Sequence, residues 1–298
     1  MRILITGAWP NAKANIPAIQ KMGHTTVFLQ NENDQIPNPQ DFDAVICNNL
    51  FKYHDIKTFT SLRYIQTESA GLDQIPDQAK HDGKITINNA NGVYSIPMAD
   101  SVLANVLQLA RHTRQFNDFQ KAKTWQKDRT LMELDGKTVV IIGMGNVAKE
   151  CAKRFKAFGC TTIALNRTIR PNPYFDTVRS LEEIDTTIPD ADILVIAIPS
   201  VPETQKLLTK ARLNKLKKTA ILVNVARGNI IDQQALLKTL PTIQGAYLDV
   251  FESEPLPSDS PLWTMPNVII TPHNSYIGDG NNQRLDSLIL KNLEEYAK

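Results

Sequence analysis

Short apolar runs alternate with polar, helix-like stretches through the N-terminal third of this 298-residue chain. Five of the runs have the length and β-rich composition of short buried strands, at residues 2–7, 25–29, 43–47, 63–66 and 84–87. Between them, residues 16–22 and 55–61 have the pattern of helices. Strands that alternate with helices are typical of a parallel sheet, so we predict a small α/β domain here.

Six further apolar runs follow. Each one ends at a polar or charged residue, or at a glycine or proline that shapes the backbone. The runs are 139–142, 162–165, 193–198, 220–226, 245–248 and 268–271, which stop at Gly143, Asn166-Arg167, Pro199, Arg227, Asp249 and Pro272-His273. Ligands of open α/β sheets bind outside the carboxyl ends of the strands. We therefore predict a six-stranded, doubly wound parallel sheet over about 96–271, with its ligand crevice at these strand ends.

Two long helical patterns flank the predicted second domain. Residues 93–114 are apolar around much of the helix circumference, which favours burial between domains or subunits. Residues 282–297 carry one apolar stripe, and we expect this last helix to pack back on the first domain. The prediction is a discontinuous domain of residues 1–95 and 274–298 and a second domain of residues 96–273.

Composition and charge exclude several functional classes. Apolar residues make up 42% of the chain, enough for two ordinary cores, and the formal charge of +2 is too small to indicate nucleic acid or an anionic membrane as the main partner. No apolar run approaches the roughly 18 residues of a membrane span. Cys47, Cys151 and Cys160 lack metal-site spacing and predict reduced core thiols in a cytoplasmic protein, with no metal site.

The most specific signal lies in residues 137–168. An apolar strand leads into Gly143-Met144-Gly145-Asn146-Val147-Ala148, and a helix-like segment and a second strand follow. This order is how proteins hold the pyrophosphate of a dinucleotide: the first glycine permits the turn, the second lets the backbone approach the phosphates, and a small third residue packs helix on strand. The helix N-terminus favours the negative charge. We predict that Gly143, Gly145, Asn146 and Val147 bind the cofactor.

The end of the second strand bears on which dinucleotide binds. NAD-specific sites usually place an acid there to bind the ribose 2′-hydroxyl, whereas an arginine accommodates a 2′-phosphate. Asn166-Arg167-Thr168 contains no acid, and Arg170 lies close behind. The alternative is that Arg167 is a solvated turn residue. The missing acid leads us to favour NADP(H), with NAD(H) possible, bound by Asn166, Arg167 and Thr168.

Two strand-end residues have the chemistry of an acid–base site. Arg227 follows a run that would otherwise be wholly buried, and a permanently charged fork at the mouth of a crevice suits a carboxylate. Next to it, Gly228 would allow a turn and Asp232 would cap the next helix. His273 ends an apolar strand, and histidine is the usual proton donor and acceptor near neutral pH. The other four histidines, which lie in loop or helix-surface contexts, are expected to be solvated: His24, His54, His81 and His112.

A histidine in this role needs an acid that holds its imidazole in one tautomer and favours its protonated form. The stretch LDVFESEPLP offers Glu252 and Glu254. An acid in a proline-bordered loop is usually a solvated turn residue, and spacing alone does not choose between the two.

Together these stretches resemble the D-isomer-specific 2-hydroxyacid dehydrogenases, over nearly all of the chain. The matching pieces are SAGLDQIP (69–76), the glycine turn, IPSVPETQKLL (198–208), ILVNVARGNIIDQQAL (221–236), LDVFESEPLP (248–257) and SPLWTMPNVIITPH (260–273). The resemblance implies a Rossmann-type nucleotide domain plus a smaller, flavodoxin-like α/β substrate domain, joined in a homodimer through the nucleotide domain.

The resemblance also assigns roles to residues. It places the catalytic arginine at Arg227, the histidine at His273, and the acid at Glu254, the one immediately before proline. The carboxylate-binding loop falls on Ala70-Gly71, and Asp249 matches an acid near the nicotinamide carboxamide. Further cofactor contacts are expected in the matching pieces, at Ile198, Pro199, Thr204 and Val225.

The implied activity is reduction of a small 2-oxo acid to the D-2-hydroxy acid, nearest the glyoxylate/hydroxypyruvate reductase branch. A phosphoglycerate dehydrogenase-like activity is an alternative, although Asn48-Asn49 lacks an arginine for a substrate phosphate. Another is a non-catalytic, dinucleotide-sensing corepressor, which would not need the Arg227, Glu254 and His273 set. A formate-type dehydrogenase would need further substrate-loop residues. The stretch 273–280, HNSYIGDG, departs from the small, glycine-rich continuation common after the family's histidine.

Overall fold

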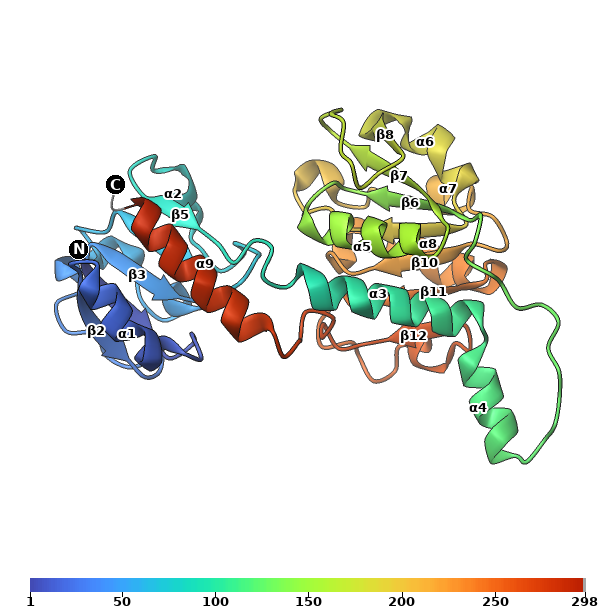
Figure 1. Cartoon of the computed structure of the whole chain (residues 1–298), viewed down its shortest axis with the longest axis horizontal. Helices are drawn as coiled ribbons and strands as arrows, with labels where there is room; N and C mark the ends of the chain where they lie inside the picture. The colour runs from blue at the N-terminus through green and yellow to red at the C-terminus, as the bar shows by residue number, and fades with distance from the viewer. Residues whose placement is uncertain (297–298) are drawn as a thin grey trace. The chain divides into compact units, whose positions relative to one another are not determined.

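The computed structural model describes residues 1–296, and the chain divides into two compact units. Unit 1 comprises Met1–Tyr94 and the chain from Gly278 onward, whereas unit 2 comprises Ser95–Ile277. Figure 1 shows both units as ribbons. The sequence places the corresponding boundaries after residues 95 and 273, so the two divisions differ by one and four residues.

Unit 1 is built on a parallel five-stranded sheet in the order β2-β1-β3-β4-β5. Its strands are β1 (Arg2–Thr6), β2 (Thr25–Leu29), β3 (Ala44–Cys47), β4 (Tyr64–Thr67) and β5 (Thr86–Asn88). This is the strand order of the flavodoxin-like fold, in which the order of the strands along the sheet reverses between the first and third strands. The five predicted strands are confirmed, each displaced by no more than two residues.

Alternate residues of β1 point to opposite faces of this sheet. Ile3 and Ile5 pack with helices α1 (Ala12–Lys21) and α9 (Asn281–Tyr296). Leu4 packs on the other face, in the cluster that includes the short helix α2 (Asp77–His81). Helix α9 is also fixed by hydrogen bonds, since Trp9 Nε1 donates to Asp286 Oδ1 over 2.6 Å and Asn292 Nδ2 donates to Gln66 Oε1 over 2.8 Å.

The helix predicted at residues 55–61 is wrong. The structure has only a 3-10 turn, Ile56–Thr58, where the Asp55 carboxylate accepts a hydrogen bond from the Lys57 N–H. The β-branched and polar residues of this stretch have low helix propensity, which explains why one turn forms and does not extend. Helix α2, which begins after Pro76, was not predicted because five residues are too few to show a helical period.

Unit 2 is built on a parallel seven-stranded sheet in the order β12-β11-β10-β9-β6-β7-β8. The strands are β6 (Thr138–Ile142), β7 (Thr161–Asn166), β8 (Thr177–Ser180), β9 (Ile193–Ile196), β10 (Ile221–Asn224), β11 (Gly245–Leu248) and β12 (Val268–Ile270). Counted within the unit, this is the Rossmann order 3-2-1-4-5-6 with one further edge strand. The doubly wound fold is confirmed, and the order of the strands along the sheet reverses between β6 and β9.

The prediction of six strands is wrong by one. The missed strand, β8, pairs only with β7 at the edge of the sheet, and none of its four residues is fully buried. Its sequence, Thr-Val-Arg-Ser, therefore lacks the apolar run by which the other six were recognised.

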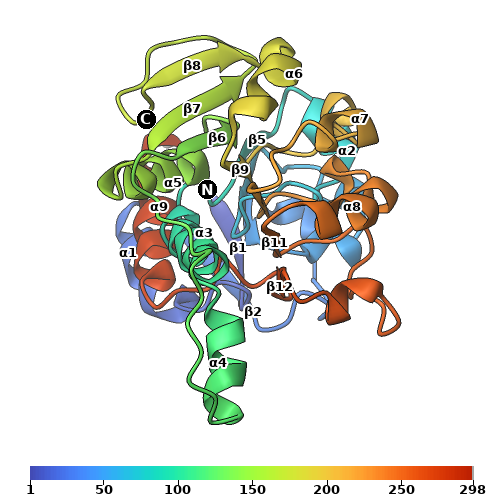
Figure 2. The ribbon, with the colours of Figure 1, turned by 90° about the vertical axis from the view of Figure 1, so that its right-hand side faces the viewer.

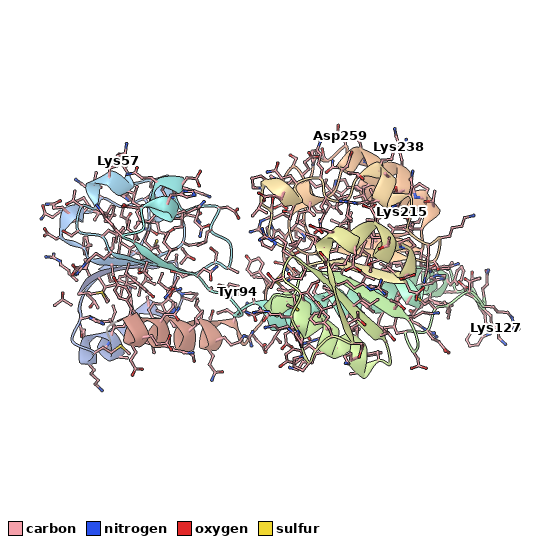
Figure 3. The ribbon with its side chains drawn as sticks, turned by 90° about the horizontal axis from the view of Figure 1, so that it is seen from above. Lys57, Tyr94, Lys127, Lys215, Lys238 and Asp259 are labelled. Carbon is pink, nitrogen blue, oxygen red and sulfur yellow. The ribbon has the colours of Figure 1, made fainter. Side chains whose placement is uncertain are left out.

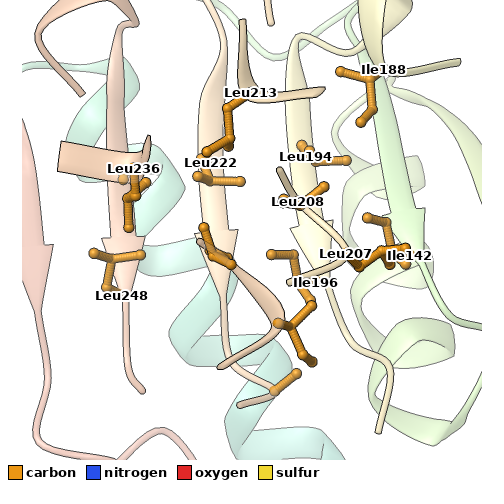
Figure 4. Close-up of a cluster of buried hydrophobic side chains, with 14 of the residues drawn as sticks. Ile142, Ile188, Leu194, Ile196, Leu207, Leu208, Leu213, Leu222, Leu236 and Leu248 are labelled. Atoms are coloured by element: carbon orange, nitrogen blue, oxygen red, sulfur yellow. The ribbon is translucent and has the colours of Figure 1, made fainter. Parts of the chain in front are cut away.

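Helices cover both faces of the unit 2 sheet. Leu194, Leu222 and Leu248 pack with α6 (Ile184–Thr187), α7 (Lys210–Leu213) and α8 (Gln233–Thr239), and Figure 4 shows this cluster. The neighbouring positions Val195 and Val223 face the opposite layer, which is formed by α3 (Ser95–Ala110) and α5 (Asn146–Ala157). A strand buried on both faces needs apolar residues at consecutive positions, which is why these strands read as unbroken apolar runs.

The helix predicted over 93–114 is in fact two helices, α3 and α4 (Thr113–Lys121). They are separated at His112, whose backbone is left-handed with φ 50°. We call residues 113–131 the arm. Its helix α4 buries no residue, and in two perpendicular views it extends away from the sheet of unit 2 (Figures 1 and 2). Lys127 lies at the outer end of the arm (Figure 3).

Cys47, Cys151 and Cys160 are buried, as the sequence predicts, and none of the three forms a disulfide. Burial raises the pKa of the Cys151 thiol to about 12 and that of the Cys160 thiol to about 11, so both stay protonated at neutral pH. Within residues 1–296, no helix is both long and apolar enough to cross a membrane.

The turn after β6 generates a prediction about stability. Gly143 has φ 110°, and a Cβ atom there would lie 2.4 Å from the Ala197 carbonyl oxygen. Because backbone strain and steric overlap each cost about 1–3 kcal/mol, Gly143→Ala is expected to destabilise unit 2 by about 2–4 kcal/mol in chemical denaturation. Gly145→Ala is the matched control: its Cβ would meet open space, and the change is expected to cost less than about 1 kcal/mol. Equal losses in the two variants would contradict this account.

Candidate active site

The glycine turn joins β6 to helix α5. Gly145 is the N-cap of α5, and the first helical hydrogen bond runs from Lys149 N to Gly145 O over 3.0 Å. Asn146 and Val147 form the first turn of the helix, and Ala148 is fully buried beneath it. No heavy atom lies within 4 Å of the place that a Cβ on Gly145 would occupy, so the backbone is open to a ligand here. The turn fits the pyrophosphate of a dinucleotide.

The end of β7 is a polar, exposed turn. Asn166 is half-buried, and its amide donates to Thr168 O over 2.9 Å, which ties the turn back on itself. Arg167 is exposed, and no ion pair joins its guanidinium to any of the residues that the structure describes. The guanidinium is therefore available to an anion.

The other predicted cofactor residues follow β9 and β10. Ile198 and Val225 are buried just past the strand ends, and Pro199 is exposed. Thr204 is 1% exposed, and its hydroxyl donates to Pro199 O over 2.8 Å. Its visible role is to hold the loop that carries Pro199.

Arg227 lies just beyond β10, in a loop that Asn224 holds. The Asn224 amide donates to Arg227 O over 3.0 Å, and its oxygen accepts from Ala226 N over 3.1 Å. The Arg227 guanidinium donates to Ala226 O over 2.8 Å. Gly228 begins the 3-10 turn Gly228–Ile230, as predicted, although its backbone is not in the left-handed region. A Cβ there would lie 1.9 Å from the Phe251 carbonyl carbon. Only glycine lets the arginine loop lie directly against the segment after β11.

That segment carries Glu254. One carboxylate oxygen of Glu254 accepts from Phe251 N over 3.0 Å, and the other is 2.8 Å from Nδ1 of His273. Glu252, which the residues alone left as an equal candidate, is exposed and forms no ion pair within residues 1–296. The geometry therefore brings Glu254, and not Glu252, onto the imidazole.

His273 follows β12 with a left-handed backbone, φ 50°, which non-glycine residues adopt only when neighbours hold them there. Its N–H donates to Asp249 O over 2.8 Å. The ring of Tyr276 stands edge-on to the imidazole, with the centroids 6.3 Å apart. Both rings remain partly exposed, so the imidazole is accessible from solvent.

Asp249 is the most deeply buried acid of this region, at 1% exposure. Its carboxylate accepts hydrogen bonds from Thr271 Oγ1, Asn274 N, and both the N–H and the hydroxyl of Ser275, over 2.5–3.2 Å. All of these donors belong to the loop around His273. The carboxylate therefore faces that loop, whereas the resemblance placed this acid near the nicotinamide.

The hydrogen bonds continue from Asp249 to helix α3. Tyr247, on β11, is fully buried, and its hydroxyl is 3.0 Å from Thr271 Oγ1 and 2.7 Å from Ser101 Oγ. The sequence analysis missed Ser101, Tyr247, Thr271 and Ser275. The cluster of hydroxyl residues beside His273 in TPHNS was a signal for the last two; nothing in the sequence pairs Ser101 with Tyr247.

Arg227, Glu254 and His273 come from the ends of β10, β11 and β12, which are neighbours in the sheet.

Of the other sequence predictions, Asp232 caps α8 by accepting from Ala235 N over 3.1 Å. The prediction that His24 and His112 are solvated is wrong. His24 is only 7% exposed, and Nδ1 of His112 is 2.7 Å from Asp128 Oδ2.

Unit 1 holds the predicted substrate loop, which follows β4. The carbonyl of Ala70 accepts from Asn89 Nδ2 over 2.6 Å, and that of Gly71 accepts from Ser69 Oγ over 2.9 Å. No hydrogen bond among residues 1–296 uses the N–H of Ala70 or Gly71. The loop is thus fixed through its carbonyls and leaves two N–H donors for an anion.

Two acids lie at the same edge of the unit 1 sheet, and the sequence analysis did not single them out. Glu32 accepts from the N–H groups of Asn48 and Asn49, each over 2.6 Å, and from Thr6 Oγ1 over 3.0 Å. Glu68, immediately after β4, is 6% exposed. Burial, and then the charge of Glu32, raise the pKa of Glu68 to about 9.

Known proteins resemble this chain along its whole length. A family model described as D-isomer specific 2-hydroxyacid dehydrogenase, NAD binding domain, matches residues 103–275. A glyoxylate reductase from Thermofilum pendens is 32% identical over 274 residues, which cover 86% of this chain and 78% of the relative. A D-3-phosphoglycerate dehydrogenase from Bacillus subtilis is 37% identical over 256 residues, 83% of this chain but only 48% of the relative.

A solved structure agrees. A D-isomer specific 2-hydroxyacid dehydrogenase family protein from Aeromonas salmonicida superposes with a TM-score of 0.85 at 28% identity, covering 99% of this chain and 94% of that one. Sequence and fold thus agree with the resemblance carried by the glycine turn and the strand ends. The chain belongs to the D-isomer-specific 2-hydroxyacid dehydrogenase family of NAD(P)-dependent oxidoreductases.

Proposed function

We propose that the protein reduces a small 2-oxo acid, such as glyoxylate or hydroxypyruvate, to the D-2-hydroxy acid. The observation that supports this most directly is the 2.8 Å contact between Glu254 and His273, beside the loop of Arg227. A carbonyl reduction needs a proton at oxygen and a hydride at carbon. The acid–histidine pair is suited to the first, and a bound nicotinamide cofactor supplies the second.

We assign the proton to Nε2 of His273. Since Nδ1 faces the Glu254 carboxylate, that contact fixes the tautomer and orients the ring, and Nε2 is the nitrogen left for the substrate. His273 donates its proton to the carbonyl oxygen as the negative charge develops there, and Glu254 stabilises the imidazolium beforehand. We propose that Asp249 holds the His273 loop in place, because its carboxylate accepts hydrogen bonds from that loop.

We propose that a guanidinium and backbone N–H groups bind the substrate carboxylate. Arg227 offers a planar guanidinium that suits a carboxylate, and its loop is fixed by Asn224 and by the glycine contact at Gly228. The N–H groups of Ala70 and Gly71 are assigned to the same carboxylate.

The cofactor is assigned to the carboxyl edge of the unit 2 sheet. Gly143, Gly145, Asn146 and Val147 would hold its pyrophosphate, and Asn166, Arg167 and Thr168 the adenosine ribose. Ile198, Pro199 and Val225 line the strand ends between these and Arg227, and Thr204 supports their loop. The exposed guanidinium of Arg167 supports a preference for NADP(H) over NAD(H).

Two alternatives receive less support. In a phosphoglycerate dehydrogenase-like enzyme, a substrate phosphate would need cations, yet the N–H groups of Asn48 and Asn49 are bound to the Glu32 carboxylate. For a dinucleotide-sensing corepressor, the ordered Glu254–His273 pair would have no purpose.

Substitutions at the acid–histidine pair test the assignment. A positioned general acid contributes about 10²–10⁴ in rate, so His273→Ala is expected to lower kcat for glyoxylate with NADPH by that factor. Glu254→Gln should lower kcat by at least about tenfold, whereas Glu252→Gln, the matched control, should stay within about twofold. A His273→Ala enzyme with wild-type kcat would show that another group delivers the proton.

Cofactor choice is tested at Arg167. Steady-state kinetics of the wild type should give a higher kcat/KM with NADPH than with NADH. Arg167→Asp is expected to lower kcat/KM for NADPH by at least about tenfold, because the new carboxylate repels the 2′-phosphate. Activity with NADH should be retained, which serves as the control for folding. A wild type that prefers NADH would contradict the proposal.

We also propose that the protein is a homodimer in which the arm packs against a second copy of the chain. Trp125 is 96% exposed, and Phe116 and Phe119 of α4 form part of an apolar groove of about 800 Å³ on the arm. An aromatic surface of this kind is typical of an interface. Sedimentation should give twice the chain mass of 33.4 kDa, and Trp125→Asp should shift it toward the monomer. A monomeric wild type at micromolar concentration would refute this proposal.

A further inference from the structure

Glu68 carries a buried oxygen that no group satisfies. The side chain is 6% exposed, and its Oε1 atom is fully buried without a hydrogen-bond partner among the described residues. Buried polar atoms in folded proteins almost always have a partner, so an unpaired carboxyl oxygen calls for an explanation. A bound ligand is one source of the missing partner.

The surroundings of Glu68 show what kind of partner is missing. No ion pair joins Glu68 or Glu32 to a cation within residues 1–296, and the Glu32 oxygens already accept three hydrogen bonds. Glu32 and the thiol of Cys47, from β3, are the titratable groups whose charges couple to Glu68. With its pKa raised to about 9 by burial and by Glu32, Glu68 is a neutral carboxylic acid at pH 7 and can donate a hydrogen bond.

The position of Glu68 links it to the substrate loop. It stands at the carboxyl end of β4, directly before Ser69-Ala70-Gly71, and beside β3 at the edge where ligands of such sheets bind. Its backbone is fixed, because the Tyr94 hydroxyl donates to its carbonyl and its own N–H donates to Cys47 O over 3.2 Å. The loop after it is braced by Gln74, whose amide donates to Ser69 Oγ over 2.6 Å.

We propose that Glu68 is a specificity-determining residue of the substrate site, which donates a hydrogen bond from its carboxyl group to an uncharged polar substituent on C3 of the 2-oxo acid, such as a hydroxyl. The proposal rests on the function proposed above. The negative charge of Glu32 beside it disfavours an anionic substituent at this place. A site built to bind a hydroxyl rejects the analogue without one, because its buried polar group is then left unpaired.

Two substrates, one with and one without the hydroxymethyl group at C3, separate this role from a structural one. Hydroxypyruvate has a C3 hydroxyl, and glyoxylate has no C3, so kcat/KM for each is measured with NADPH in the wild type, Glu68→Leu and Glu68→Gln. Glu68→Leu is expected to lower kcat/KM for hydroxypyruvate by about 10–100-fold and to leave that for glyoxylate within about twofold. Glu68→Gln keeps a donor of similar length and should retain most of the hydroxypyruvate activity.

An equal loss for both substrates in Glu68→Leu, or no loss for hydroxypyruvate, would overturn the proposal. Turnover of neither substrate by the wild type would instead refute the proposed function, so the two failures are distinguishable.

The protonation of Glu68 is tested separately through thermal stability. An acid whose pKa rises from 4.5 to about 9 on folding keeps a proton that the unfolded chain releases, so its presence lowers stability progressively as pH rises between those values. The Glu68→Gln variant has no group that titrates here, so it does not lose stability in this way as pH rises. Its melting temperature should therefore exceed that of the wild type by more at pH 8.5 than at pH 5. A difference that does not grow with pH would show that Glu68 is ionised and is no donor.

Discussion

The geometry of the candidate site depends on the buried carboxylate of Asp249. A carboxyl group away from water is tolerated only where hydrogen-bond partners surround it, and here the donors all come from the loop around His273. The same residue accepts the His273 N–H through its backbone carbonyl. The hydrogen bonds of one residue at the end of β11 therefore hold the left-handed backbone that presents the imidazole.

The parallel sheet brings together site residues that are far apart in the sequence. β10, β11 and β12 are parallel neighbours, so their carboxyl ends lie along one edge about 4.8 Å apart from strand to strand. An arginine, an acid and a histidine, each a few residues past its strand, thus come together although 46 residues separate the first from the last. Gly228 completes the approach, because any side chain there would collide with the Phe251 backbone.

The carboxyl edges of the two sheets differ in chemistry. In unit 2, the exposed Arg167 and the half-buried Arg227, together with the N-terminus of α5, suit the anionic parts of a dinucleotide and a carboxylate. In unit 1, the corresponding edge carries Glu32 and Glu68, and the Ala70-Gly71 loop there offers two N–H donors. The two edges therefore suit chemical groups of different charge.

The sequence by itself determined the fold class, eleven of the twelve strands found within residues 1–296, and the glycine turn. Each of these depends on apolar runs and glycines that act locally, within a few residues.

The sequence did not reveal β8, since an edge strand needs little burial, or the break at His112, which depends on contacts with distant residues. Glu252 and Glu254 were equivalent by spacing until the tertiary structure turned one toward His273. Hydrogen bonds between residues far apart in the chain, such as Ser101 with Tyr247, and the burial that leaves Glu68 unpaired exist only once the chain has folded. Local patterns therefore decided the elements, and packing decided which side chains meet.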